Sequence, residues 1–144
     1  MTLEELFCKQ ECQDLIVRYF MLLDTGPRSK AVDLFSDDGK MIVPGGPAEG
    51  VPPGLLFGNL PQEFVPIHLA TNIWITPTGP DTAEASTYVV AYNLFGKVDD
   101  ALPRKMPPTP SRIGKIDFKF RKTAAGWRIS QFKPNAAFID DGLT

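Results

Sequence analysis

The chain has 144 residues, of which 43% are hydrophobic and 22% are charged, and its formal net charge is −2. This length and composition are typical of one globular domain and exclude a disordered chain. The slightly negative charge excludes the basic surface that nucleic-acid binding needs, and no apolar run is long enough to cross a membrane. We therefore expect a single domain over residues 1–144, with neither nucleic acid nor a membrane as partner.

We expect no secretion signal in residues 1–10, because Glu4 and Glu5 stand where a signal peptide carries basic residues and then an apolar stretch. We therefore expect a cytoplasmic protein. Cys8 and Cys12 lie one helical turn apart, which is poor geometry for a disulfide, and are interpreted as small apolar fillers. With one histidine in the chain, a zinc site of cysteine and histidine cannot be assembled.

The first part of the chain is predicted to be helical. Apolar side chains recur at helical spacing over residues 3–24, and Gly26-Pro27 ends this amphipathic helix. The elements expected next are a short helix over 29–35, a strand over 40–43, a Gly/Pro-rich loop over 44–58 and one helical turn over 59–64.

The second part of the chain is predicted to be a sheet. Its expected strands cover residues 67–76, 82–95, 112–122 and 127–133. In the first strand, alternation places Ile67, Leu69, Thr71, Ile73 and Ile75 on one face and His68, Ala70, Asn72 and Trp74 on the other. In the third, Ile116, Phe118 and Phe120 face inward. Helices that precede strands in this way indicate an α+β domain with an antiparallel sheet.

Three residues do not fit a purely structural pattern. Asp24 lies in the last turn of the first helix, where the helix dipole disfavours a carboxylate, although it could be an ordinary solvated acid. His68 has the one side chain that titrates near neutrality, so it could be a general base or simply a buried core residue. Arg112 stands at the rim of the inward face of its strand, or at an exposed strand end.

Four segments carry a further pattern: Asp14–Asp24, Val32–Gly39, Ile67–Asn72 and Gly126–Ser130. Together they resemble SnoaL-like proteins of the nuclear-transport-factor-two-like superfamily. The resemblance spans residues 5–133 and implies a cone-shaped, curved antiparallel sheet packed on N-terminal helices, a cystatin-like α+β barrel with a deep apolar pocket. It also implies that the pocket-forming core covers residues 5–133 and that residues 134–144 are a tail.

The resemblance further implies a catalytic pair. Dehydrochlorinase and dehydratase members of the family carry an aspartate at the end of the first helix and a histidine on this strand, where Asp24 and His68 stand. His68 would then be the general base, and Asp24 would fix its tautomer and stabilise the imidazolium. The expected function is proton abstraction from carbon in a small apolar substrate, ending in elimination, isomerisation or cyclisation. No metal or organic cofactor is implied.

The expected substrate-binding residues are Tyr19, Asn72, Trp74, Tyr88, Tyr92, Arg112 and Phe132, with Tyr19 as a hydrogen-bond donor to a substrate oxygen. The resemblance places the lysine of the dehydrochlorinases close to Tyr19 and their pocket arginine at Phe132, and the second histidine of the dehydratases is absent. The alternative is a non-catalytic module that binds a ligand or dimerises on the same fold. An epoxide hydrolase would need an Asp–Arg–Asp set that this sequence does not place.

We also expect a symmetric homo-oligomer, most simply a dimer, because relatives with this fold associate through the sheet. The smooth patch expected to carry this contact consists of Ala83, Ala85, Thr87, Val89 and Ala91.

Overall fold

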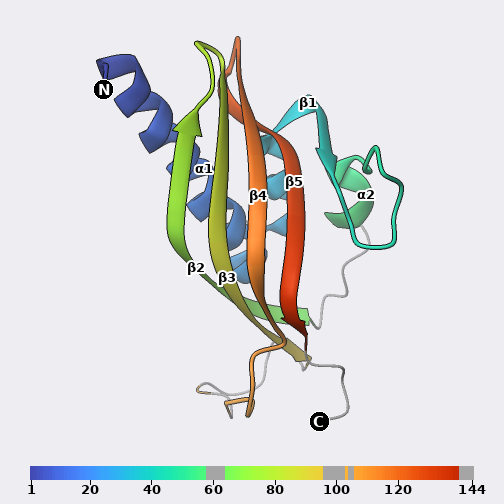
Figure 1. Ribbon diagram of the computed structural model, residues 1–144. Helices are drawn as coiled ribbons and strands as arrows, with labels where there is room; N and C mark the ends of the chain where they lie inside the picture. Colours follow the sequence, from blue (N-terminus) through green and yellow to red (C-terminus); the bar gives the residue numbers. More distant parts are fainter. Residues whose placement is uncertain (58–63, 96–102, 104–105, 140–144) are drawn as a thin grey trace.

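The computed structural model describes residues 1–57, 64–95, 103 and 106–139. Its elements are α1 (Leu3–Thr25), the 3₁₀ helix η1 (Arg28–Leu34), β1 (Phe35–Met41), α2 (Pro53–Phe57), β2 (Phe64–Pro77), β3 (Thr82–Phe95), β4 (Arg112–Thr123) and β5 (Gly126–Ile139). In Figure 1, α1 and η1 lie behind the four long strands, with β1 and α2 beside them at one edge. None of the described helices is both long and apolar enough to span a membrane.

The long helix α1 has a defined beginning and end. Thr2 and Glu5 form a capping box in which each side chain accepts a hydrogen bond from the other residue's backbone N–H. Gly26 ends the helix at φ 73°, a left-handed region that favours glycine, and its N–H donates to the Leu22 carbonyl. The buried face of α1 consists of Cys8, Cys12, Leu15, Ile16, Tyr19, Phe20 and Leu23. Both cysteines are free thiols within this face.

The sheet has five strands in the order β1-β5-β4-β3-β2. Neighbouring strands from β2 to β5 are antiparallel, whereas β1 pairs with β5 in parallel. The expected α+β fold is confirmed, but the sheet is mixed, and in the described part of the chain it does not close into a barrel. The chain enters β1 from η1, and no hairpin connects β1 to β5. The two strands are therefore not required to be antiparallel.

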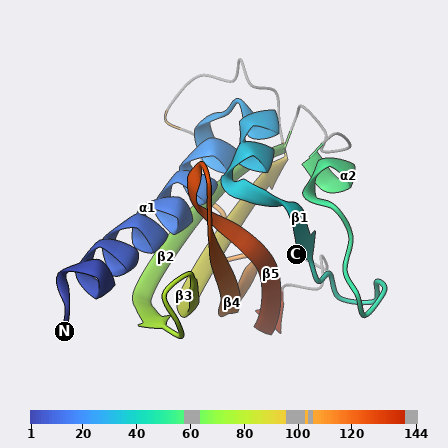
Figure 2. The same cartoon turned by 90° about the horizontal axis from the view of Figure 1, so that it is seen from above.

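The core lies between α1 and one face of this sheet. Seen from above in Figure 2, α1 runs obliquely across that face. Ile116, Phe118 and Phe120 of β4 are buried here, as the alternation predicts, and they meet Ile16 of α1 and Ile129 of β5 in one apolar cluster. The opposite face of the sheet is exposed. The inner face of the sheet therefore forms the core and can line a cavity, and the outer face contacts solvent or a partner.

A β-bulge in β2 makes one predicted face wrong. The register against β3 shifts between Thr71 and Trp74, and Asn72 adopts φ 53°. The extra residue inverts the alternation, so residues before and after it change sides. Ile75 is therefore buried, whereas Ile67 and Leu69, predicted to share its face, are exposed.

Several boundaries also differ from the predictions. The second helix is a 3₁₀ helix that ends at Leu34, and the first strand begins directly after it, at Phe35. The Gly/Pro-rich loop contains the short helix α2, and β5 continues past its predicted end, to Ile139. The predicted helical turn over 59–64 lies outside the described residues, except for Phe64, which begins β2.

The smooth patch expected to carry a subunit contact is buried, which corrects that prediction. Ala83, Ala85, Thr87, Val89 and Ala91 all face α1. The reason is their register: Ala85 pairs with the buried Phe118, and in an antiparallel pair directly opposed residues share a face. Any contact through the sheet must therefore use the even-numbered residues of β3.

Candidate active site

Asp24 and His68 are in direct contact although 44 positions separate them in the chain. The Asp24 Oδ2 atom accepts a hydrogen bond from the backbone N–H of His68 at 2.8 Å, and Oδ1 lies 2.5 Å from His68 Nδ1. The two side chains are only 12% and 14% exposed. A carboxylate only accepts hydrogen bonds, so Nδ1 is the donor in this contact, and in the neutral ring the lone pair is then on Nε2.

The local sequence explains how this pair forms. Asp24 lies on the last turn of α1, just before Gly26 ends the helix, so its carboxylate leaves the helix toward β2. The two N–H groups of His68 offset the unfavourable helix dipole at this position. The imidazole also packs against Phe20, with ring centroids 5.1 Å apart, which fixes its orientation.

A cavity of about 460 Å³ lies between α1 and the inner face of the sheet. Its lining residues are Tyr19, Phe20, Leu23, Val43, Pro44, His68, Val89, Ala91, Arg112, Gly114, Lys115, Ile116, Phe132, Pro134, Asn135, Ala136 and Ile139. A second cavity, of about 240 Å³, has Tyr19, Leu23 and His68 in common with the first. His68 therefore stands between two hollows whose walls are mostly apolar, as is typical of small-molecule sites.

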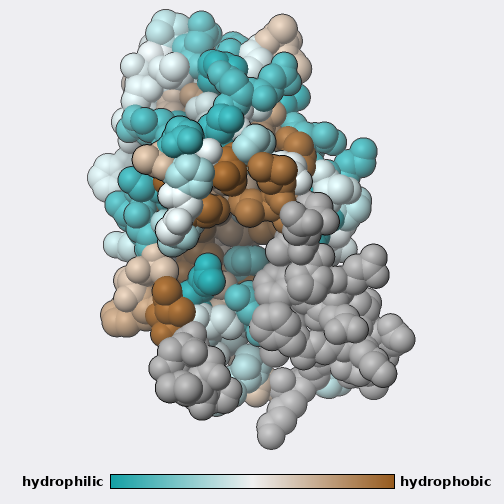
Figure 3. Space-filling view, turned by 90° about the vertical axis from the view of Figure 1, so that its right-hand side faces the viewer, coloured by the Kyte–Doolittle hydropathy of each residue, from teal (hydrophilic) through white to brown (hydrophobic). Residues whose placement is uncertain are grey.

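The smaller cavity also has walls from β1 and α2, through Met41, Leu56 and Phe57. Figure 3 views the molecule from the side of these two elements, where apolar side chains gather around a hollow. The smaller cavity therefore joins apolar side chains of β1 and α2 to His68 in one lining.

Tyr19 is the one polar residue of α1 in both cavities. It is 3% exposed, and its ring packs against five aromatic neighbours at centroid distances of 5.0 to 6.4 Å, namely Phe20, Phe35, Phe57, Phe118 and Phe132. Burial raises the pKa of its hydroxyl, which therefore stays protonated. No described residue accepts or donates a hydrogen bond at this hydroxyl, so it is available to a bound molecule.

Of the residues predicted to bind substrate, Tyr19, Arg112 and Phe132 line the cavity. Tyr88 and Trp74 do not, because they are 54% and 76% exposed on the outer face of the sheet. Tyr92 pairs with the exposed Ile67 and shares its outer face, and Asn72 is exposed at the bulge. The alternation of β3 and the inversion at the bulge account for these four corrections.

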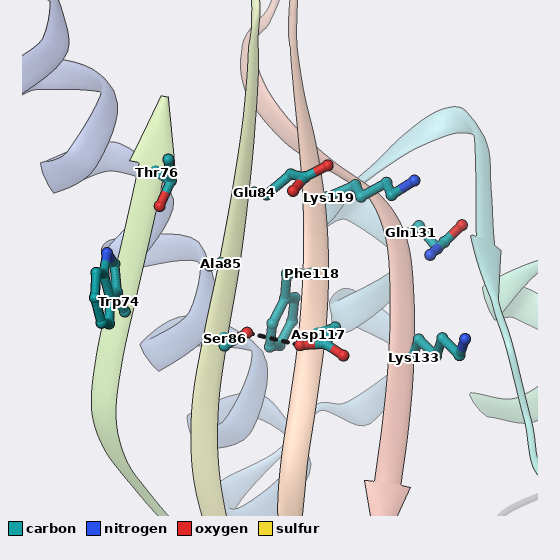
Figure 4. A pocket seen from close by; sticks show the side chains of 10 residues that line it. All are labelled: Trp74, Thr76, Glu84, Ala85, Ser86, Asp117, Phe118, Lys119, Gln131 and Lys133. Carbon is teal, nitrogen blue, oxygen red and sulfur yellow. Dashed lines mark hydrogen bonds between the residues drawn. The ribbon is translucent and has the colours of Figure 1, made fainter. Parts of the chain in front are cut away.

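Trp74 instead lies beside a shallow hollow of about 440 Å³ on the outer face of the sheet. Figure 4 shows its polar walls, where Glu84 points toward Lys119 and the Ser86 hydroxyl donates to Asp117 at 2.6 Å. Because this hollow lies on the far side of the sheet from His68, we do not assign it to the active site.

Arg28 lines the smaller cavity, and the sequence did not single it out. It begins η1 directly after the turn at Gly26-Pro27, and its Nε donates to the Leu23 carbonyl at 3.2 Å. Leu56 and Phe57 were missed for a similar reason, because they lie in a segment predicted to be loop. Nothing in the apolar periodicity of these segments marks them as cavity walls.

No group of three or more histidine, cysteine, aspartate or glutamate side chains is placed to hold a metal ion anywhere in the described ranges.

A family model described as a SnoaL-like domain matches residues 4–133. Similar solved structures include a protein provisionally assigned as a scytalone dehydratase from Novosphingobium aromaticivorans, with 17% identity over 98% of this chain and 91% of that one, and a TM-score of 0.78. Hexachlorocyclohexane dehydrochlorinase LinA type 3 from Novosphingobium barchaimii has 17% identity over 96% and 92% of the two chains, with a TM-score of 0.72.

A nuclear-transport-factor-two-like protein with a cystatin-like fold, also from Novosphingobium aromaticivorans, has 23% identity over 96% of this chain and 86% of that one, and a TM-score of 0.63. No curated protein sequence matches the chain significantly. At these identities the structural similarity establishes the fold, while the family model confirms the resemblance predicted from the sequence.

Proposed function

Because the chain belongs to the SnoaL-like domain family, we propose that it is a cofactor-independent enzyme that removes a proton from carbon in a small, largely apolar substrate. The observation that carries the proposal is the carboxylate of Asp24, hydrogen-bonded to both the ring and the backbone of His68 at the wall of an apolar cavity. A buried base held in one tautomer has a clear use in proton transfer, whereas a carrier needs only apolar walls.

In the proposed reaction, Nε2 of His68 takes a proton from a substrate carbon, and the electron pair of the broken C–H bond moves into the substrate. Asp24 stabilises the imidazolium that forms, as the carboxylate of a catalytic triad does. The Tyr19 hydroxyl donates a hydrogen bond to the substrate oxygen on which negative charge develops. Departure of a halide ion, or of a hydroxyl group that takes the proton back from the imidazolium and leaves as water, completes an elimination. Return of the proton to another carbon completes an isomerisation. Attack of the carbanion on an electrophilic carbon of the same molecule gives cyclisation.

Exchange of hydrogen for deuterium at carbon tests the proton transfer without knowledge of the natural substrate. The probe is 2-tetralone, an apolar ketone with acidic C–H groups, observed by proton NMR in D₂O. We expect the protein to accelerate the exchange over buffer and His68→Gln to lose the acceleration. Binding of 2-tetralone with no accelerated exchange would contradict the enzyme and favour the ligand-binding module.

We further propose a symmetric homodimer through the outer face of the sheet. Ile67, Leu69, Tyr88 and Ile113 are exposed there, and the register places Leu69, Val90 and Ile113 in one row across three strands. A two-fold axis pairs such a patch with itself. Light scattering should give twice the chain mass, and Leu69→Lys should shift it toward the monomer, while Thr76→Lys, on the polar half of the same strand, should not. A monomer at high micromolar concentration would contradict this assembly.

A further inference from the structure

The inner face of the sheet places an arginine opposite the candidate base. His68 pairs with Ala91, and Ala91 pairs with Arg112, so the three residues form one row across β2, β3 and β4 and share a face. At about 4.8 Å between neighbouring strands, the Cα atoms of His68 and Arg112 are about 10 Å apart. Only the methyl group of Ala91 stands between them, which leaves the floor of the cavity open.

The charges around the cavity leave Arg112 without a counterion among the residues that the structure describes. No lining residue is acidic, and Lys115, the other basic residue of the lining besides Arg112 and His68, has its Nζ 3.4 Å from Asp117. Asn135 also lines the cavity, but its amide donates to Asp117 at 2.9 Å. The carboxylate of Asp24 is already held by His68. Among the residues that the structure describes, the exposed Arg112 is therefore a cation of the larger cavity with no acidic side chain paired to it.

We propose that Arg112 binds the carboxylate of a monoanionic substrate whose apolar body fills the cavity and whose reacting carbon lies at His68. The planar guanidinium presents two parallel N–H donors that match the two oxygens of a carboxylate. Apolar walls formed by Phe20, Val89, Ile116 and Phe132 would contact the apolar body of this substrate. The span between the two residues fits one ring, or a chain of similar length, between the carboxylate and the acidic carbon.

This inference rests on the proposed function for the role of His68, but the binding of a carboxylate can be tested without turnover. The probes are 2-naphthoate and its neutral isostere 2-naphthamide, with dissociation constants measured by calorimetry at low and physiological salt. We expect naphthoate to bind about 10- to 100-fold more tightly than naphthamide, which is the range for a hydrogen bond to a charged group.

Arg112→Gln should remove this preference and leave the affinity for naphthamide within about twofold. The matched control is Lys119→Gln on the outer face of the same strand, which should keep the preference. Equal affinity of the wild type for the two probes would overturn the proposal, as would a preference that survives Arg112→Gln. Tighter, Arg112-dependent binding of 2-naphthyl phosphate would also overturn it, because the site would then select phosphate.

The variant Asp24→Asn separates this inference from the proposed function. In this variant, His68 should no longer catalyse exchange of the carbon-bound hydrogen of 2-tetralone. The preference of the variant for naphthoate over naphthamide should persist, because Arg112 is unchanged. A carboxylate preference without any exchange in the wild type would contradict the enzyme alone. Exchange without a carboxylate preference would contradict the role of Arg112 alone.

Discussion

Replacement of Asp24 by asparagine tests the proposed pair most sharply, because it keeps the size of the side chain and changes one oxygen to an amide nitrogen. Both oxygens of Asp24 are used by His68, one by the backbone N–H and the other by Nδ1. Asparagine can satisfy only one of these donors with its carbonyl oxygen. The other contact must therefore change, and the two possible arrangements have different consequences.

In the first arrangement, the amide oxygen accepts from the His68 backbone and the NH₂ group faces Nδ1, which must then become an acceptor. The ring proton moves to Nε2, and the nitrogen proposed as the base loses its lone pair. In the second, the NH₂ group faces the backbone N–H, so two donors oppose each other at a cost of about 1–3 kcal/mol. The first arrangement is favoured, and we expect deuterium exchange to slow by about 10³- to 10⁴-fold.

Asp24→Asn should change the free energy of unfolding only slightly, although it slows deuterium exchange strongly. The variant exchanges charge-assisted hydrogen bonds for neutral ones, which costs about 1 kcal/mol of unfolding free energy, and it relieves an unfavourable helix dipole. The assay is urea unfolding and deuterium exchange on the same preparation, with the rate expressed per folded molecule. Asp14→Asn, on the exposed face of α1, is the matched control and should change neither quantity. Wild-type exchange per folded molecule in Asp24→Asn would refute the reasoning.

Three other variants probe the rest of the account. Tyr19→Phe should keep or slightly raise the melting temperature, since no described residue bonds the hydroxyl, and should slow exchange about 10- to 100-fold; unchanged exchange would exclude Tyr19 as a donor. Phe118→Ala removes a fully buried ring and should cost about 3–5 kcal/mol in urea unfolding; a loss below 1 kcal/mol would contradict the described core. Hydrogen bonds from Arg121 and Ser36 hold the pKa of Asp38 below its usual range, so its stabilising effect is present at neutral pH and is lost in acid. Asp38→Asn should therefore lower the melting temperature slightly at pH 7. This difference from the wild type should vanish as the pH falls through the acidic range where Asp38 becomes protonated. A difference that persists in acid would contradict the pairing of Asp38 with Arg121.

The parts of the fold that follow from local patterns were predictable. The strand over residues 82–95 was predicted with its observed bounds, because β-branched and aromatic residues continue between clear turn residues. The inward face of β4 also followed from strict alternation. These features depend on the local chain alone, which a single sequence records directly.

The features that were missed depend on contacts distant in sequence. The bulge at Asn72 inserts one residue into β2 and exposes Trp74, and no glycine marks the left-handed conformation. The direction of β1 depends on β5, which lies about ninety residues later. The cavity faces of β3 could not be assigned because both of its faces are rich in apolar and aromatic residues. The contact of Asp24 with His68 was expected from the family resemblance rather than from spacing.

The central claim is that Asp24 fixes the tautomer of the neutral His68 ring, so that Nε2 carries the lone pair and is available to a substrate. Because His68 is the only histidine in the chain, a long-range ¹H–¹⁵N NMR spectrum of uniformly labelled protein reports this ring without overlap. For the neutral ring, the account predicts that the proton is on Nδ1 and that Nε2 has the chemical shift of an unprotonated nitrogen, and that Asp24→Asn reverses the two. A neutral ring protonated on Nε2 in the wild type would contradict the account.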